Sequence, residues 1–464
     1  MIHQYKNNGY NIVLDVNSGS IHVVDDVVYD VLSLMDEENA DRYGEAEFSR
    51  IADVILKNDY KEEVTKEDLK DVFSDLQELE ENGTLFTKDV YKEGVIDFKK
   101  RQTVVKALCL HIAHDCNLAC RYCFAGEGEY QGDRSLMSYE VGKKALDFLV
   151  ANSGSRRNLE VDFFGGEPLL NFDVVKKLVA YGREIEKEKD KHFRFTLTTN
   201  GVLLNDDIIE FANQEMDNIV LSIDGRKEVH NHMRPFKNGT GSYDFKFKKV
   251  AESRNQQKYY VRGTFTHNNL DFVEDVLHLA DEGFEQISVE PVVADPNEPY
   301  AIRPEDIPQI CEGYDILAKE MLARKKQGKG FNFFHYMIDL SGGPCVYKRL
   351  SGCGSGTEYL AVTPWGDLYP CHQFVGEEQF CLGNVDDGVV NTDMRDTFKL
   401  CNVYAKEECR NCFAKFYCSG GCAANAYHCH GDINKPYETG CELQRKRVEC
   451  AIMLKAAEAY DEEN

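Results

Sequence analysis

Three cysteines have a spacing that could hold a reactive metal centre. Cys116, Cys120 and Cys123 form the pattern C-x3-C-x2-C directly after an apolar run that predicts a strand. Three thiolates can hold three irons of a four-iron cluster and leave the fourth iron open to a chelating ligand. Zinc is the alternative, because it usually takes four ligands and His114 is near enough in sequence to be the fourth. The spacing therefore predicts a metal centre and leaves the metal open.

A second and denser set of cysteines lies in the C-terminal third. Residues 345–450 contain twelve of the seventeen cysteines, with many glycines and little regular periodicity. Cys409, Cys412, Cys418 and Cys422 form C-x2-C-x5-C-x3-C, and Cys441 follows. A disulfide framework is not expected in a chain of this length without a secretory signal. The region is therefore predicted to be organised by metal, with a zinc ribbon as the alternative to iron–sulfur clusters.

Composition narrows the class of protein. The chain has 464 residues, of which 42% are apolar, and a formal net charge of −26. A nucleic acid partner is not expected, because phosphate backbones need clustered Lys and Arg. No apolar run approaches the ~18 residues of a membrane span, and the first ten residues lack the apolar core of a secretory signal. We expect an acidic, soluble, cytoplasmic protein with neither a nucleic acid nor a membrane as its partner.

Short apolar strands alternate with helix-length segments in the middle of the chain. This alternation predicts an α/β fold in which a partial (β/α)6 barrel spans residues 107–310. Catalytic groups would then lie on loops at the carboxyl ends of the strands. The expected strands are Leu108–His114, Glu160–Phe164, Arg194–Thr199, Asn218–Ile223, Val261–Thr266 and Gln286–Val292.

The remaining segments have different patterns. Residues 1–90 predict a hairpin followed by helices, 91–106 a charged linker, 311–344 a bridging region and 451–464 a C-terminal tail. In the first segment, strands are expected at Asn11–Val16 and Ser20–Val24, around the turn Asn17-Ser18-Gly19. Asp25 and Asp26 are expected to cap a helix through Met35. Thr65 and Asp68 resemble a capping box for a helix that runs to Glu81.

The first cysteine motif also has a family resemblance. HDCNLACRYCFAG resembles the signature of the radical S-adenosylmethionine (SAM) superfamily, and three further motifs follow in the order seen in that family. These are the Gly-Gly-Glu turn at 164–168, Thr199-Asn200-Gly201 and the segment 221–225. Without the resemblance, Ser222 would be read as a strand cap and Arg234 as a surface residue. The resemblance implies that SAM is bound by Tyr122, Gly165, Gly166, Glu167, Ser222 and Arg234, with the turn at the methionyl amine, Ser222 at the ribose and Arg234 at the methionyl carboxylate.

The C-terminal cysteines resemble the SPASM extension of radical peptide-modifying enzymes, which carries two auxiliary four-iron clusters. The resemblance implies three 4Fe-4S clusters in all. Cys345 is the expected fourth ligand of the first auxiliary cluster, and the alternative is an iron left open to a substrate thiolate. The implied ligands are Cys353, Cys371 and Cys422 for the first auxiliary cluster, and Cys409, Cys412, Cys418 and Cys441 for the second. Ordinary thiols are expected at Cys109, Cys311, Cys381, Cys401, Cys429 and Cys450.

The N-terminal segment resembles the winged-helix-like element that binds a leader peptide by adding a strand to its sheet edge. Taken whole, the chain resembles the six-cysteine (SCIFF) peptide maturases. That resemblance implies thioether formation in a ribosomally made, cysteine-rich precursor peptide with a leader. It also implies an electron donor such as flavodoxin or ferredoxin. The alternatives are an anaerobic sulfatase-maturing enzyme, whose catalytic Asp has no assigned counterpart here, and a non-catalytic iron–sulfur electron-transfer protein. No catalytic residue is assigned beyond the cluster ligands.

Overall fold

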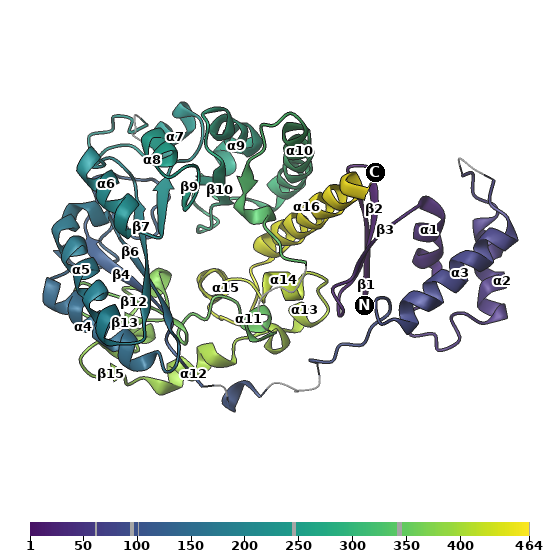
Figure 1. The fold of residues 1–464 in the computed structure, drawn as a ribbon, viewed down its shortest axis with the longest axis horizontal. Coiled ribbons are helices and arrows are strands. Elements are labelled where there is room, and N and C mark those ends of the chain that lie inside the picture. The colour runs from purple at the N-terminus through teal and green to yellow at the C-terminus, as the bar shows by residue number, and fades with distance from the viewer. Residues whose placement is uncertain (61–62, 93–96, 101, 244–246, 341–345, 464) are drawn as a thin grey trace.

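Two bodies lie on either side of a long helix (Figure 1). The structure, a computed structural model, describes residues 1–463 except 61–62, 93–96, 101, 244–246 and 341–345. The helix is α16 (Glu438–Glu463). A large sheet covered by helices lies on one side of it, and a small sheet with three helices lies on the other. Both chain ends lie beside the small sheet.

The N-terminal unit is a three-stranded antiparallel sheet, in the order β1-β2-β3, with three helices. The expected turn joins β2 to β3, and Asp25 caps α1 by accepting a hydrogen bond from Val28 N. Thr65 and Asp68 form the expected capping box of α3. The bounds are β1 Ile2–Asn7, β2 Tyr10–Asp15, β3 Ile21–Val24, α1 Asp26–Leu34, α2 Glu45–Ile55 and α3 Lys66–Glu81.

Two of these elements, β1 and α2, were not predicted. β1 carries polar side chains whose partners are distant in sequence. His3 contacts Glu449 at 2.9 Å between Nε2 and Oε1, and Asn7 donates to Asp315 at 2.7 Å. Polar residues that face a neighbouring helix do not show the alternation of apolar and polar residues by which strands are recognised. β1 is thereby fastened to the body of the protein rather than only to β2.

The larger sheet confirms the expected α/β fold. Six strands lie in chain order and pair in parallel, and each was expected within two residues of its observed ends. β11 (Asn332–Phe333) adds to β10 in parallel, and β5 (Ser135–Leu136) pairs with β4. The six strands are β4 Ala107–His114, β6 Asn158–Gly165, β7 His192–Thr199, β8 Asn218–Ser222, β9 Tyr259–Phe265 and β10 Gln286–Pro291.

The cysteine-rich region shares this sheet. β12 (Tyr359–Val362) pairs in parallel with β4, whose other neighbour is β6. Three short antiparallel strands then extend the sheet. They are β13 Asp367–Tyr369, β14 Gly383–Asn384 and β15 Gly388–Val389. The sheet therefore joins the first barrel strand directly to the region that holds most of the cysteines.

Two of the expected segment ends fall inside helices. α10 (Ile307–Lys326) crosses the expected boundary at residue 310. Residues 451–463 continue α16 instead of forming the expected tail, because Ile452, Met453 and Ala457 are buried. The other helices are α4 Tyr139–Asn152, α5 Phe172–Glu188, α6 Asp206–Glu215, α7 Lys227–Met233, α8 Phe247–Ser253, α9 Phe272–Asp281, α11 Val346–Ser351, α12 Thr392–Leu400, α13 Glu407–Arg410, α14 Lys415–Cys418 and α15 Ala423–His430.

The two faces of the parallel sheet differ in chemistry. Side chains such as Leu159, Val161 and Phe163 are buried in the apolar core between the sheet and its helices. Because successive side chains of a strand alternate between faces, the residues between them face the other way. That inner face is polar and carries Asp162, Thr198, Ser222, Arg262 and Glu290. A polar inner face suits a reaction site rather than a packed core.

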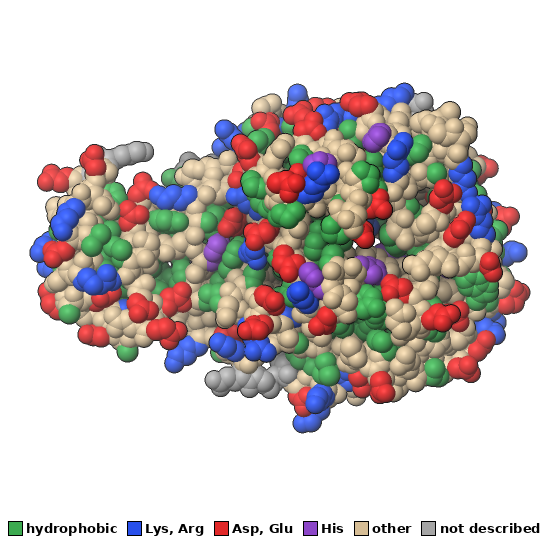
Figure 2. All heavy atoms as spheres, turned by 180° about the vertical axis from the view of Figure 1, so that it is seen from behind, with side chains coloured by type: hydrophobic (Ala, Val, Ile, Leu, Met, Phe, Trp, Pro, Cys, Tyr) green, Lys and Arg blue, Asp and Glu red, His purple; other side chains and the backbone are tan. Residues whose placement is uncertain are grey.

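Acidic and basic side chains are mixed over the face shown in Figure 2 and do not gather in one patch. Among the residues that the structure describes, no helix is both long enough and apolar enough to cross a membrane.

Candidate active site

The first three cysteines lie on the loop that follows β4, where the barrel strands end. Burial raises the pKa of Cys116 to about 12 and that of Cys120 to about 11, and the neighbouring thiols of this loop add to both shifts. The three thiols are therefore near enough to affect ionisation at one another, although no three ligand side chains among the described residues already have the arrangement of a metal site. Burial keeps these thiols protonated in the absence of a cation. Metal binding requires the deprotonated thiol, so a bound cation would stabilise the charged form that burial disfavours.

Bare backbone lies beside this loop, at the carboxyl end of β6. Gly165 has φ +116°, a conformation that L residues rarely adopt, and a Cβ there would collide with the Ala113 carbonyl. A Cβ on Gly166 would collide with the Asp115 carbonyl. Both positions thus require glycine. The turn packs directly against the residues that lead into the Cys116 loop.

Glu167 is fully buried behind this turn, where three donors hold its carboxyl group. Thr199 Oγ1 donates at 2.7 Å, Asn200 N at 2.8 Å and Leu169 N at 3.0 Å. Burial raises the pKa of Glu167, and these hydrogen bonds oppose the shift. Asn200 also reaches the cysteine loop, since its Nδ2 lies 3.6 Å from Cys116 Sγ. Hydrogen bonds therefore join the Gly-Gly-Glu turn to the Thr199-Asn200-Gly201 segment, and join that segment to the cysteine loop.

Tyr122, Asp224 and Arg234 form a buried polar group on the other side of the loop. Tyr122 Oη donates to both carboxylate oxygens of Asp224 at 2.8 Å, and Arg234 Nη1 donates to Tyr122 at 2.9 Å. Burial raises the pKa of Asp224 to about 6, while Arg234 lowers it. Arg234 also lowers the pKa of Cys120, so the two side chains are close. Ser222 ends β8 two residues before Asp224 and is half-buried.

The donor set fits SAM on a three-thiolate cluster. Arg234 Nε is buried and has no hydrogen-bond partner among the described residues, so it can bind a ligand carboxylate. In the glycine turn, Gly165 O accepts from Tyr130 Oη at 3.2 Å, and a carbonyl oxygen has a second lone pair that can accept from an amine. Cys116, Cys120 and Cys123 supply the soft ligands that iron–sulfur clusters take. The structure brings these expected groups to one end of the barrel; their contacts with a cofactor stay a prediction.

The C-terminal thiols form two further groups. Burial raises the pKa of Cys409 to about 12, and Cys418, Cys441 and Cys412 add to that shift. Burial also raises the pKa of Cys441 to about 11, with Cys418 and Cys412 adding to the shift. In a second group, burial raises the pKa of Cys371, and Cys422 and Cys353 add to that shift. The two groups match the two ligand sets implied by the resemblance, and ligation itself stays a prediction. Cys345 lies outside the described residues.

Several residues near these sites were not singled out from the sequence. Cys401, expected to be an ordinary thiol, lines the same small pocket as Cys353. Asp162 lies on the inner face of the barrel, where burial raises its pKa to about 7. The available signal was an aspartate between the apolar residues Val161 and Phe163. His111, which was not singled out, is buried 3.0 Å from His114 between Nδ1 and Nε2; His114 is the residue considered above as a fourth zinc ligand.

A cavity joins the auxiliary thiols to the barrel. It has a volume of about 690 Å³ and extends from Pro291, Val292 and Val293, at the end of β10, to the cysteines. Cys353 and Cys422 are exposed, whereas Cys418 and Cys441 are half-buried. The four cysteines that line it are Cys353, Cys418, Cys422 and Cys441.

Comparison with known proteins identifies the region that carries the first cysteine motif. Residues 110–280 match the family model of the radical SAM superfamily. An uncharacterized protein of Methanocaldococcus jannaschii is 28% identical over 61% of this chain and 90% of its own length. A cysteine-type anaerobic sulfatase-maturating enzyme of Clostridium novyi is 24% identical over 67% of this chain and 86% of its own length.

Two solved structures share the fold. Native anSMEcpe with bound AdoMet and the Cp18Cys peptide has a TM-score of 0.62 at 20% identity, covering 76% of this chain and 98% of its own. SuiB of Streptococcus suis bound to the precursor peptide SuiA has a TM-score of 0.51 at 15% identity, covering 95% of this chain and 98% of its own. The second similarity therefore extends over more of this chain than the first.

Proposed function

We propose that this chain, a radical SAM enzyme related to the anaerobic sulfatase-maturating enzymes, forms thioether bonds in a cysteine-rich precursor peptide. The cavity of about 690 Å³ carries the proposal, because it opens both to the end of β10 and to Cys353 and Cys422. One peptide can therefore lie in this cavity with a carbon atom near the end of β10 and a sulfur atom near Cys353 and Cys422. Holding two reacting groups together is a large part of catalysis.

Each residue of the site has a proposed role. Cys116, Cys120 and Cys123 hold the cluster. Arg234 binds the methionyl carboxylate of SAM, and the Gly165–Gly166 turn receives its amine. When bound, SAM and the cluster supply a carbon radical that removes a hydrogen atom from the peptide. The protein orients the peptide and excludes water.

Each thioether bond removes two hydrogen atoms from the peptide, which is a two-electron oxidation. One leaves as the hydrogen atom taken from carbon; the thiol loses the second proton to solvent, and the remaining electron would pass to the clusters. Cys353, Cys371 and Cys422, with Cys345 or a substrate thiolate as fourth ligand, hold the first auxiliary cluster. Cys409, Cys412, Cys418 and Cys441 hold the second. A flavodoxin or ferredoxin supplies the initial electron.

The N-terminal sheet is the proposed site for the leader peptide. Among the described strands, β3 pairs only with β2, so its outer edge is available for strand addition. Asp15 N donates to Ser20 O, and hydrogen-bonded pairs alternate with non-bonded pairs in antiparallel strands. Val23 lies opposite Ile12 in a non-bonded pair. Its N–H and C=O therefore point toward the open edge.

Formation of formylglycine is the second candidate, favoured by the 24% identity to the sulfatase-maturating enzyme. The similarity to the solved structure of anSMEcpe covers only 76% of this chain, whereas the similarity to SuiB covers 95%. The greater coverage by SuiB supports a peptide maturase with an N-terminal unit.

Mass spectrometry distinguishes the two reactions. The anaerobically reconstituted protein is incubated with SAM, a reductant and the cysteine-rich peptide encoded beside its gene. A thioether product loses two hydrogen atoms per bond and keeps all its sulfur, whereas formylglycine formation removes the cysteine sulfur. Loss of sulfur would refute the proposal. Absence of 5′-deoxyadenosine would instead favour a non-catalytic electron-transfer protein.

The leader site is tested by Val23→Pro, which removes the outward N–H, with Val23→Thr as a control that keeps it. Proline should weaken leader binding about tenfold, equivalent to ~1.4 kcal/mol and to one lost backbone hydrogen bond. Fluorescence anisotropy with a labelled leader measures the affinity. Equal affinities for the two variants would exclude strand addition at β3.

A further inference from the structure

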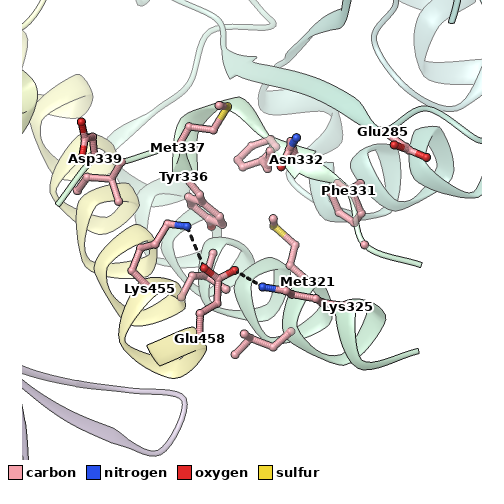
Figure 3. A pocket seen from close by; sticks show the side chains of 15 residues that line it. Glu285, Met321, Lys325, Phe331, Asn332, Tyr336, Met337, Asp339, Lys455 and Glu458 are labelled. Carbon is pink, nitrogen blue, oxygen red and sulfur yellow. Dashed lines mark hydrogen bonds and ion pairs between the residues drawn. The ribbon is translucent and has the colours of Figure 1, made fainter. Parts of the chain in front are cut away.

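Three cavities follow one another along α16. The first, of about 1110 Å³, lies between β3, α1, α3 and the last turns of α16. The second, of about 550 Å³, lies between α10, β11 and α16 (Figure 3). The third is the cavity at the auxiliary thiols. Lys455 lines the first and second, and Met337, Ile338 and Asp339 line both the second and the third.

We propose that the precursor peptide, between its leader and its first modified cysteine, lies extended along α16 through these cavities. This inference rests on the proposed function, because it takes the β3 edge as one end of the path and the auxiliary thiols as the other. Each cavity shares wall residues with the next, so the three lie in a row between the two ends. We name this path the α16 channel and define it by Tyr460, Leu454, Met337, Met321 and Arg447.

Exposed apolar side chains mark the α16 channel. Met337 is 58% exposed, Tyr460 54% and Leu340 38%. Large apolar side chains that gather along one route on a surface usually mark a binding site. Methionine suits such a wall, because its flexible side chain adapts to different partners. Figure 3 shows Met321, Tyr336 and Met337 around the space between α10 and α16.

The charged groups of the middle cavity are largely paired with each other. Glu458 accepts from Lys325 at 2.8 Å and from Lys455 at 2.9 Å, as the dashed lines of Figure 3 mark. Apolar side chains make up much of the remaining wall, including Met321, Leu322 and Phe331. Such a wall recognises an extended segment with small and apolar side chains better than a strongly charged one.

The length of the channel sets a minimum length for that segment. The helix rises ~1.5 Å per residue, so the stretch of α16 between Cys441 and Tyr460 is roughly 28 Å long. An extended peptide spans ~3.3 Å per residue, and about nine residues are needed to cover the same distance. The peptide should therefore have a spacer of about nine residues between leader and first modified cysteine.

The first experiment shortens the spacer of the neighbouring-gene peptide from its natural length to four residues. Anisotropy with the leader segment should stay unchanged, whereas the rate of thioether formation should fall at least tenfold. A four-residue spacer that is modified at the parent rate would overturn the channel. Failure of the parent leader to bind would overturn both the channel and the proposed leader site.

The second experiment uses Met337→Glu, with Ile316→Glu as a matched control on the exposed surface of α10, where Ile316 is 47% exposed. Met337→Glu should weaken binding of the full-length peptide about tenfold and leave binding of the isolated leader unchanged. The control should alter neither affinity. Equal effects of the two variants would overturn the channel.

The position of the bound spacer is tested with a benzophenone amino acid in the middle of the spacer. Photocrosslinks should map to residues 331–340 or to α16 between 451 and 460. Crosslinks confined to other surfaces would overturn the path. A change of oligomeric state in Met337→Glu would also overturn it, because the apolar wall would then belong to an interface between copies of this chain.

Discussion

The candidate site at the ends of the barrel strands and the C-terminal thiols are built in different ways. Glu167 is held by three hydrogen bonds, and Tyr122, Asp224 and Arg234 are joined in a buried group at the ends of long parallel strands. Among the C-terminal thiols, Cys441 lies on the long helix α16, whereas Cys409 and Cys418 lie on α13 and α14, helices of four residues each, and Cys412 lies on the loop between them. Helices this short are not stable by themselves. We therefore expect the barrel to position its site without metal, and the segments around α13 and α14 to become rigid only when the proposed clusters are bound.

Two buried lysines of the C-terminal region also indicate that this region differs from the barrel in its need for metal. Lys406 and Lys415 are each only 2% exposed within the cysteine-rich region. Lys406 lowers the pKa of Cys409, and Lys415 pairs with Asp89 at 2.7 Å. A buried ammonium is costly unless negative charge lies near it. Asp89 supplies that charge to Lys415, and thiolates around a bound cluster would supply it to Lys406, so we expect metal loading to be coupled to folding around Lys406.

The largest expected effect is on radical formation. Replacing Cys116, Cys120 and Cys123 together with Ala should lower 5′-deoxyadenosine production by ~10³-fold or more, because no other group holds the cluster beside the glycine turn. Substantial iron should remain on the C-terminal cysteines. Chromatography of the nucleoside and an iron assay measure both quantities. Retained SAM cleavage would show that these cysteines are not the reactive centre.

A smaller effect should follow the removal of all metal. Amide exchange in α13, α14 and α15 should accelerate by ~10²-fold, whereas exchange in β6, β7 and β8 should change little, because metal-dependent regions lose their folding energy without the ion. Hydrogen-exchange mass spectrometry of metal-loaded and metal-free protein gives the comparison. Uniform acceleration in both regions would contradict a preformed barrel site.

The smallest effect concerns a carboxyl group inside the barrel. Asp162 ionises near pH 7 in the folded protein and near pH 4 in the unfolded chain. Between these values the folded state binds more protons, so the contribution of Asp162 to the free energy of unfolding falls as pH rises. Asp162→Asn should therefore stabilise the protein by ~2 kcal/mol more at pH 8 than at pH 5.

Urea unfolding of the metal-free protein at the two pH values measures this difference. Asp53→Asn, on the exposed side of α2, serves as the control. An equal gain for Asp162→Asn at both pH values would show that its carboxyl group is not desolvated.

Sequence patterns over short windows predicted those helices and strands whose position is set by neighbouring residues. The six barrel strands, the cap of α1 and the capping box of α3 follow from apolar runs and from Asp25, Thr65 and Asp68. β1 was missed because the partners of His3 and Asn7 lie more than 300 residues away. The last turns of α16 were missed because their apolar residues pack against α10 and the N-terminal sheet. Such elements depend on tertiary contacts that no short window contains.

The candidate site divides in the same way. The Gly165–Glu167 turn, Tyr122 and Arg234 were found through motif resemblance, and the structure brings them to one end of the barrel. Asp224 stood within a quoted motif but gained a role only when its hydrogen bonds to Tyr122 were known. Cys401 could not be distinguished from ordinary thiols, because its proximity to Cys353 arises from the folding of separate segments.

The pairing of β4 with β12 has a consequence for synthesis on the ribosome. Leu108 pairs with Leu360, so the two partners are 252 residues apart (360 − 108). At ~5–20 residues per second, one edge of β4 stays unpaired for roughly 10–50 s after that strand is made. An unpaired strand edge is a template for aggregation. We therefore expect nascent chains that stall before residue 360 to depend on chaperones, and the Cys116 loop to be open to iron–sulfur assembly proteins during the same interval.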